Sequence, residues 1–161
     1  MNVCEYQGVR LLDNLGIDYV IKQNQYSEAY TCSEVARERD VSLSQVLKCM
    51  VGRDSCDSDD EVYVMMISGD KKIALSKVRH LAEGKKIALF SRSELTKNFD
   101  VTVGAITPLQ FLGKARFFLD RTVLQEEHVD ISTGFTDSGI WLKTTALVKL
   151  LNPTIGDIIS E

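Results

Sequence analysis

A lysine in an apolar run is the first residue of this sequence whose setting suggests chemistry. Lys48 lies in the segment SQVLKCMVG (44–52), most of which is apolar and typical of a buried strand. A lysine in such a run costs free energy unless its ammonium group finds a partner, reaches water at the end of the strand, or takes part in chemistry. Lys48 is therefore the first candidate functional residue.

Two later segments could place polar groups around a ligand. The loop GAITP runs from Gly104 to Pro108 and joins a flexible glycine to a rigid proline, so it could bring backbone N–H groups close to a ligand or simply form a turn. Asp120 ends the apolar segment ARFFLD, and the turn Ser132-Thr-Gly134 follows. Asp120 could orient a lysine or a ligand hydroxyl, but it could equally cap the next turn.

Motifs of several common enzyme classes are absent from the sequence. There is no GxxxxGK[ST] phosphate loop, no GxGxxG dinucleotide fingerprint and no GxSxG nucleophile elbow. The cysteines form no CxxC pair and the two histidines are far apart, which argues against a structural zinc site and for free thiols (Cys4, Cys32, Cys49, Cys56; His80, His128). We therefore expect neither a metal nor a cofactor.

Length and composition indicate one globular domain. The chain of 161 residues is 44% hydrophobic and 26% charged, and it is long enough to form a single core over residues 1–161. No run reaches about 18 apolar residues, the length that a membrane span needs. The N-terminus also lacks the layout of a secretion signal, so we expect no membrane span and a cytoplasmic location.

The charge is unevenly distributed along the chain. The formal net charge of −4 argues against a protein that coats nucleic acid by bulk electrostatics. Residues 71–97, however, contain eight basic and two acidic residues, which gives a local net charge of +6. This segment could bind a small part of a polyanion, or it could form an ordinary solvated face.

Apolar periodicity and capping residues predict alternating short helices and strands. Helices are expected over 5–15, 31–39, from Ser76 to Gly84, from Ser91 onward and over 145–151, with capping boxes at Thr31–Glu34 and Ser91–Glu94. Strands are expected over 17–23, 44–52, 62–68, 86–90, 101–103, 115–120, 128–132, 140–143 and 155–159, with an exposed turn over 53–60. The pattern indicates an α/β domain in which short helices pack on a mixed, multi-stranded sheet.

The order of these features resembles one protein family. The segments SQVLKCMV, VGAITPLQ, FFLD, ISTGFTDSGIWL and ALVKLL follow one another as in the YbaK/ProX family of aminoacyl-tRNA deacylases, which is related to the editing domain of bacterial prolyl-tRNA synthetases. The resemblance covers about residues 5–160. It implies a single editing domain with a partly barrel-like sheet. It also implies an enzyme that hydrolyses the ester between a wrong amino acid and the 3′ end of a tRNA, with prolyl-tRNA synthetase as a further partner.

The resemblance assigns the site to a small set of residues. The essential lysine of the family falls on Lys48, and a polar residue near its pocket mouth falls on Asn24 or Tyr26. The loop, the strand end and the following turn supply the remaining positions, with the usual serine of the loop replaced by threonine (Gly104, Thr107, Pro108, Asp120, Ser132, Gly134).

Several departures from the family pattern bear on amino-acid specificity. Cys49 stands where Thr, Ser or Asn usually follows the lysine, and Ala105 replaces the second glycine of the loop. The turn reads STG where SGG is common, and neither histidine lies at the position of the histidine in alanine-specific relatives. The resemblance therefore leaves open whether the amino acid is cysteine or alanine, and whether the tRNA is tRNA(Pro).

Elementary chemistry gives Lys48 the role of a cation. A lysine with an ordinary pKa of about 10.4 is a poor general base, so we expect Lys48 to bind a phosphate or carbonyl oxygen of the terminal adenosine while Asp120 holds it in place. Backbone N–H groups near Gly104 and Gly134 would stabilise the oxyanion. No side chain of the set is an obvious nucleophile, so water or a substrate hydroxyl or thiol would attack. A non-catalytic module for aminoacyl-tRNA ends, and a structural domain with Lys48 at a wet strand end, remain alternatives.

Overall fold

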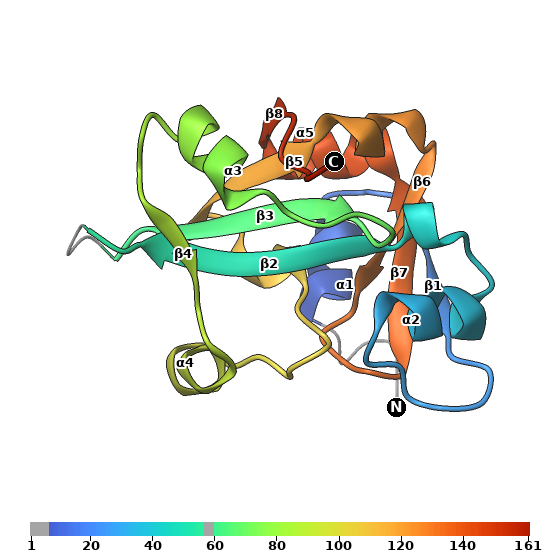
Figure 1. Ribbon diagram of the computed structural model, residues 1–161. Helices are drawn as coiled ribbons and strands as arrows, with labels where there is room; N and C mark the ends of the chain where they lie inside the picture. Colours follow the sequence, from blue (N-terminus) through green and yellow to red (C-terminus); the bar gives the residue numbers. More distant parts are fainter. Residues whose placement is uncertain (1–6, 57–59) are drawn as a thin grey trace.

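Five strands form the larger of two sheets in the computed structural model, which describes residues 7–56 and 60–161 (Figure 1). The strand order is β4-β2-β3-β5-β8. β2 pairs antiparallel with β3 and β4, while β5 pairs parallel with β3 and β8, so the sheet is mixed as the sequence predicts. The bounds are β2 Leu47–Asp54, β3 Val62–Ser68, β4 Ile87–Leu89, β5 Ala115–Asp120 and β8 Thr154–Gly156.

Three strands form the smaller sheet, in the order β1-β7-β6 with both pairings antiparallel. The bounds are β1 Tyr19–Gln23, β6 His128–Ser132 and β7 Ser138–Lys143. A parallel bridge between Val46 and Asp130 links the entry to β2 with β6, and so brings the two sheets together at one corner. The α/β class with a mixed sheet is confirmed, but the two sheets are not closed into a barrel.

Short helices surround the sheets (Figure 1). They are α1 Gln7–Asn14, α2 Cys32–Arg39, α3 Leu75–Leu81, α4 Arg92–Asn98 and α5 Thr144–Leu151, with 3₁₀ turns η2 Leu43–Gln45, η3 Pro108–Phe111 and η4 Arg121–Gln125. Both predicted capping boxes are confirmed, because Thr31 caps α2 and Ser91 caps α4, each with a glutamate at the third helical position. These caps fix where the two helices begin.

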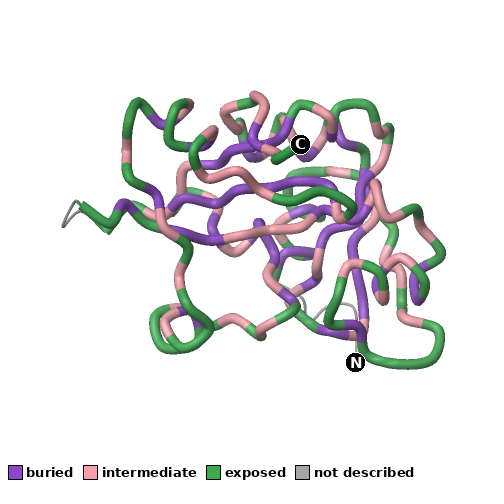
Figure 2. Tube along the Cα trace, viewed as in Figure 1, coloured by how far each residue is buried: buried purple, intermediate pink, exposed green. Residues whose placement is uncertain are grey.

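Alternating side chains of the larger sheet enter two apolar clusters. On one face, residues such as Val64 and Phe117 pack against Ile131 and Leu142 of the smaller sheet. On the other face, Tyr63 and every second residue after it in β3 pack under α3 and the C-terminal segment. Figure 2 shows the buried residues running along the central strands and the exposed ones in the surrounding turns and helices. β2 and β3 are therefore held rigidly, and the residues at the edges of these strands have fixed positions.

The predicted start of one helix and one predicted strand are wrong, for reasons that lie in contacts within the fold. Ser76 does not cap α3: the helix begins after Ala74, whose N–H donates to the carbonyl of Ile158 at 2.8 Å and so docks the chain on the C-terminal segment. No strand forms over 101–103, because Thr102 and Ala105 close a tight turn through Gly104, which has φ of 88°.

Other predicted elements are shorter than expected or fall partly outside the description. The strand predicted over 155–159 is reduced to β8, and Ile159 makes only an isolated bridge with Ile73. Residues 57–59 of the predicted turn, residues 5–6 of the first predicted helix, and Cys4 lie outside the described residues.

Candidate functional site

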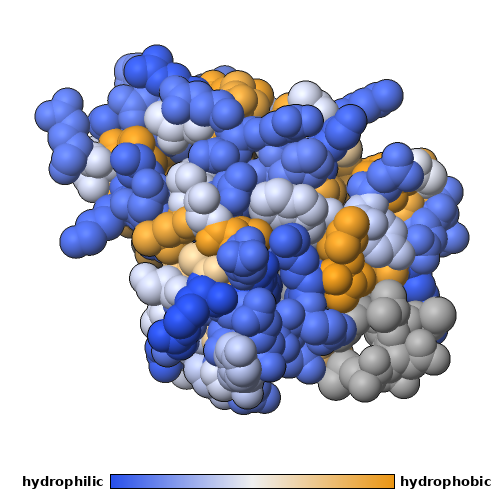
Figure 3. Space-filling model, turned by 90° about the vertical axis from the view of Figure 1, so that its right-hand side faces the viewer, coloured by the Kyte–Doolittle hydropathy of each residue, from blue (hydrophilic) through white to orange (hydrophobic). Residues whose placement is uncertain are grey.

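A cavity opens beside the first half of β2, where that strand has an open edge. β4 pairs with β2 only over Gly52–Asp54, so no described strand pairs with that edge over residues 47–50. The cavity holds about 470 Å³, and its walls come from β2, the start of α2, the loop at 104–106 and β6. On the side of the molecule that carries α2, hydrophilic side chains surround a smaller number of apolar ones (Figure 3).

Lys48 contributes a cation to this cavity. Its side chain is half-buried, and its ammonium group donates to the carbonyl of Lys71 at 3.1 Å. None of the ion pairs formed by the described residues includes Lys48. An ammonium group with one neutral partner keeps its attraction for a ligand oxygen.

The first turn of α2 adds backbone donors to the same wall. Thr31 Oγ1 accepts from the N–H of Glu34 at 3.2 Å, and the Glu34 carboxylate accepts from the N–H groups of Tyr30 and Thr31. These backbone hydrogen bonds lower the pKa of Glu34 below its ordinary value. Cys32 and Ser33 line the cavity, and the first N–H groups of a helix have no partner within it. This end of α2 is therefore suited to an anionic or carbonyl oxygen.

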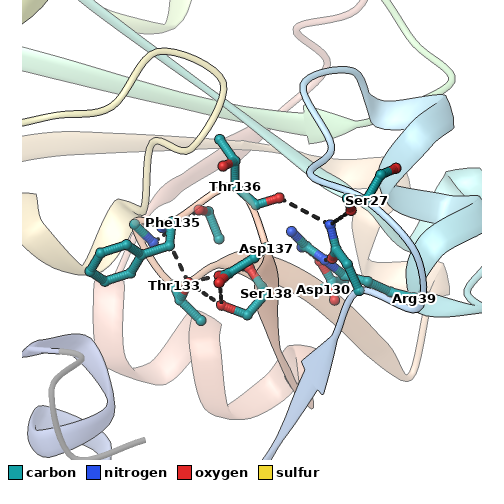
Figure 4. Close-up of polar contacts among 11 residues, drawn as sticks. Ser27, Arg39, Asp130, Thr133, Phe135, Thr136, Asp137 and Ser138 are labelled. Carbon is teal, nitrogen blue, oxygen red and sulfur yellow. Dashed lines mark hydrogen bonds and ion pairs between the residues drawn. The ribbon is translucent and has the colours of Figure 1, made fainter. Parts of the chain in front are cut away.

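A buried ion pair also lines the cavity. Arg39 Nη1 lies 2.6 Å from Asp130 Oδ1, and the two side chains are 3% and 1% exposed. Arg39 Nε also donates to Asn24 Oδ1 at 2.9 Å, so the guanidinium group is fixed in place. Figure 4 shows Arg39 and Asp130 pointing toward one another beside the turn at 133–138.

Asp130 is only partly satisfied by this pair. Its second oxygen, Oδ2, accepts no hydrogen bond from the described residues. Burial raises the pKa of Asp130 to about 6, against the opposing charges of Arg39 and Lys22. The ion pair packs against Gly139, because a Cβ at that position would lie 2.3 Å from Arg39 Nη1 and 2.6 Å from Oδ2. The fold thus buries a carboxylate oxygen that none of the described residues pairs with.

The two thiols beside the cavity are poor nucleophiles. Burial raises the pKa of Cys49 to about 12. Burial also raises the pKa of Cys32, although the charge of Lys48 works in the opposite direction. Because the thiolate is the nucleophilic form, neither cysteine is activated for covalent catalysis. Cys32, Cys49 and Cys56 are free thiols.

The loop and turn singled out in the sequence contribute to two different cavities. Lys48, Gly104 and Ser132 line the cavity beside β2. Thr107 and Gly134 line a second cavity of about 680 Å³. Thr107 caps η3, since its Oγ1 accepts from the N–H of Leu109 at 3.3 Å, and buried Pro108 is the first residue of that turn. Ser132 Oγ accepts from the N–H of Gly134 at 3.0 Å, which links the two residues of the STG turn.

Asp120 does not reach Lys48, and the expected contact between them is therefore wrong. Asp120 is fully buried and caps η4, with hydrogen bonds from the N–H and hydroxyl of Thr122 and from the N–H of Ile158 at 2.9 Å. It lines neither cavity. Its hydrogen bonds tie the end of β5 to the C-terminal segment, which is a structural role.

The aromatic residue at the cavity is Tyr30 rather than Tyr26. Tyr26 is 89% exposed and lines neither cavity, whereas Tyr30 lines the cavity beside β2 and lies against Gly104. Asn24 is a structural residue, because its amide donates to the carbonyls of Ser27 and Thr136 while its oxygen accepts from Arg39. The polar position near the mouth of the cavity is therefore filled by Tyr30, from the segment that leads into α2.

Two residues of the site were missed by sequence reasoning. Arg39 and Asp130 are 91 residues apart, and nothing in the sequence links them. Asp130 lies in a strand that was predicted, and its charge in an otherwise apolar HVDIS segment was a usable signal of the same kind as Lys48. The donors at the start of α2 could also have been inferred from the capping box at Thr31.

Part of the basic segment 71–97 is used within the fold. Lys77 pairs with Asp157 at 2.8 Å, Lys85 lies 3.8 Å from Asp54, and Arg79 donates to the carbonyl of Ile87. Among residues 7–56 and 60–161, no cluster of three His, Cys, Asp or Glu side chains could hold a metal ion. In the same residues, no helix is long and apolar enough to cross a membrane.

Solved structures with the same fold span nearly the whole chain. The hypothetical protein APE2540 gives a TM-score of 0.83 at 22% identity, with 94% of this chain and 97% of that chain covered. A proposed trans-editing enzyme for prolyl-tRNA synthetase gives a TM-score of 0.76 at 18% identity, with 96% and 97% covered. At such identities the likeness establishes the fold. None of the curated proteins matches this chain.

The sequence itself carries the family assignment. Residues 27–150, which include every wall of the cavity beside β2, match the family model of the aminoacyl-tRNA editing domain. The match covers more than half of the chain, and it confirms the resemblance that the lysine, the loop and the turn indicate. The chain therefore belongs to the aminoacyl-tRNA editing domain family.

Proposed function

We propose that this protein is a trans-acting deacylase that removes a wrongly attached amino acid from the 3′ end of a tRNA. The observation that carries the proposal is the cavity beside β2, which combines the cation of Lys48, the donors at the start of α2 and the carboxylate of Asp130. An aminoacyl ester on adenosine offers oxygens and an ammonium group to such a set. Membership of the editing-domain family supports the same activity.

Catalysis would rest on charge stabilisation and positioning. Water adds to the acyl carbon, the bond to the ribose 3′ oxygen breaks, and that oxygen takes a proton, so the products are the free amino acid and the tRNA. Lys48 and the N–H groups at the start of α2 would hold a phosphate or the ester carbonyl while the oxyanion forms. The raised pKa values of Cys32 and Cys49 favour attack by water or a substrate group over a covalent intermediate.

We propose a small amino acid, alanine or cysteine on tRNA(Pro), as the substrate. A cavity of about 470 Å³ that also accepts part of the terminal adenosine has little room left for a large side chain. One similar structure is that of a proposed trans-editing enzyme for prolyl-tRNA synthetase, which makes this synthetase a candidate partner. Since one methylene is worth only about 1–3 kcal/mol of discrimination, a separate editing step is useful for small side chains.

A non-catalytic module that binds aminoacyl-tRNA ends is the second candidate. The observation that favours it is the absence of an activated nucleophile among the described side chains of the cavity. The two functions differ in turnover. A binding module would protect the ester of a bound tRNA, whereas a deacylase would release many amino acids per protein molecule.

Deacylation assays would test the proposal. Alanyl- and cysteinyl-tRNA(Pro) are mixed with the parent, with Lys48→Ala, and with Lys149→Ala as a control, because Lys149 is an exposed lysine of α5 that does not line the cavity. We expect multiple turnovers by the parent and by Lys149→Ala. Lys48→Ala should lose a factor of about 10²–10³ in kcat/KM, the usual cost of one oxyanion donor. Equal rates for the parent and Lys48→Ala would refute the role of the cavity, and protection without release would favour the binding module.

A further inference from the structure

We infer that the free carboxylate oxygen of Asp130 binds the α-ammonium group of the substrate. The cavity would then recognise an aminoacyl ester as distinct from any other acyl ester. This inference rests on the proposed function, and it assigns one more part of the same site.

The hydrogen-bonding state of Asp130 is the first argument. An ionised carboxylate can accept about four hydrogen bonds, but Oδ1 receives one from Arg39 and Oδ2 receives none from the described residues. Buried polar atoms are nearly always hydrogen-bonded, and an unpaired one costs free energy. Asp130 is 1% exposed and lines the cavity, so a donor for Oδ2 can come from a bound molecule.

The surroundings of Asp130 hold this oxygen ready for a ligand. Arg39 is fixed between Asn24 and Asp130, so the carboxylate cannot rotate without breaking a 2.6 Å contact. Gly139 lets the ion pair pack closely on β7, because a Cβ at that position would lie 2.3 Å from Arg39 Nη1 and 2.6 Å from Oδ2. A rigidly held acceptor is what recognition of an ammonium group requires.

The distribution of charge in the cavity gives the second argument. Lys48 and the start of α2 present positive charge and N–H donors, whereas Asp130, whose Oδ1 is paired with Arg39, presents the acidic side chain among the described lining residues. An aminoacyl ester at the 3′ end of a tRNA carries the matching pattern, with phosphate and carbonyl oxygens on one part and an ammonium group on another. Placing the ammonium group at Asp130 would direct the ester carbonyl toward Lys48 and α2, because the opposite orientation would bring like charges together.

The test replaces the ammonium group in the substrate. Alanyl-tRNA and lactyl-tRNA, in which a hydroxyl group replaces the α-ammonium group, are prepared on the same tRNA. Each enzymatic rate constant is divided by the spontaneous rate of hydrolysis of that ester, which removes the difference in intrinsic reactivity. The enzymes are the parent, Asp130→Asn, and Asp100→Asn as an exposed control that lies outside the cavity beside β2.

We expect the parent to favour alanyl-tRNA by about 10- to 100-fold, the range for a hydrogen bond to a charged group. Asp100→Asn should keep this preference. Asp130→Asn should lose it through a lower rate with alanyl-tRNA, with lactyl-tRNA changed little. If Asp130→Asn fails to fold, equal corrected rates of the parent with the two esters would still refute the inference.

Three outcomes would overturn the inference. Equal corrected rates of the parent with both esters would refute ammonium recognition and leave the proposed deacylase intact. A preference that survives in folded Asp130→Asn would place the recognition of the ammonium group elsewhere. Hydrolysis of neither ester, nor of cysteinyl-tRNA(Pro), would refute the proposed function, and this inference with it.

Discussion

The two cavities that flank the 104–108 loop differ in how far the charged groups of their walls are buried. The smaller one, beside β2, contains an ammonium group, the start of a capped helix and a buried carboxylate with a free oxygen. The larger one, of about 680 Å³, is lined mainly by uncharged residues, with the exposed Asp100 and Lys114 among them. Volume alone would select the larger cavity, whereas unsatisfied buried polar groups select the smaller one.

The backbone of the loop between the cavities explains why neighbouring residues of the GAITP motif line different cavities. Thr107 has extended backbone angles, with φ of −96° and ψ of 133°. Side chains of successive residues in an extended segment point to opposite sides. Ile106 consequently lines the cavity beside β2, and Thr107 lines the other one. Residues that are adjacent in a motif therefore need not share a site.

The largest expected effect comes from removing Arg39, the partner of the buried carboxylate that distinguishes the cavity beside β2. Arg39→Met leaves the Asp130 carboxylate buried without its counter-charge, so we expect a loss of about 3–5 kcal/mol in the free energy of unfolding at pH 7. Arg37→Met, at an exposed position of the same helix, is the control and should change stability little. Urea denaturation measures both variants.

The pH dependence of this loss has a definite sign. Burial already raises the pKa of Asp130 to about 6 in the folded protein, and removal of Arg39 would raise it further, while an unfolded aspartate titrates near about 3.9. The folded variant therefore holds a proton that the unfolded chain has released, so its stability decreases as pH rises through this window. The loss in Arg39→Met should shrink at pH 4.5, and an equal loss at both pH values would contradict the buried-charge explanation.

The next effect concerns the pH dependence of activity. The ammonium group binds only the ionised carboxylate, and the pKa of Asp130 is raised to about 6 by burial against the charges of Arg39 and Lys22. The ratio of kcat/KM for alanyl-tRNA between the parent and Asp130→Asn should fall by about tenfold per unit as pH drops below about 6. A ratio that stays constant between pH 5 and pH 7.5 would exclude titration of Asp130 as its cause.

The smallest expected effect separates the two capped helices. Thr31→Ala and Ser91→Ala each remove an N-cap hydrogen bond, so each should cost about 1 kcal/mol of stability. Only α2 borders the cavity beside β2, so only Thr31→Ala should also lower the deacylation rate. Equal rates for the two variants, measured where both are folded, would show that the start of α2 does not act on the substrate.

The sequence predicts those parts of the structure that depend on local patterns. The two capping boxes, the apolar strands β2 and β3, and the unusual setting of Lys48 all follow from neighbouring residues. The start of α3 does not, because contact with Ile158 fixes Ala74 as its cap.

The two aspartates show why the site was harder to predict than the fold. Asp120 of β5 and Asp130 of β6 are both buried, and either could hold a cation. Asp120 receives hydrogen bonds from Thr122 and Ile158, and it is structurally satisfied. Asp130 keeps a free oxygen because its partner, Arg39, comes from a helix 91 residues earlier and reaches only one side of the carboxylate. Only the tertiary arrangement distinguishes them.

The most direct test of the account is to see which cavity binds the substrate end. In 3′-deoxy-3′-(alanylamino)adenosine an amide replaces the ester, so binding can be followed without hydrolysis by the backbone amide NMR signals of the ¹⁵N-labelled protein. We predict shifts at Cys32, Lys48 and Gly104, and weaker binding by Asp130→Asn. Shifts confined to Phe99, Gln110 and Gly134, which line the larger cavity, would contradict the assignment of the site.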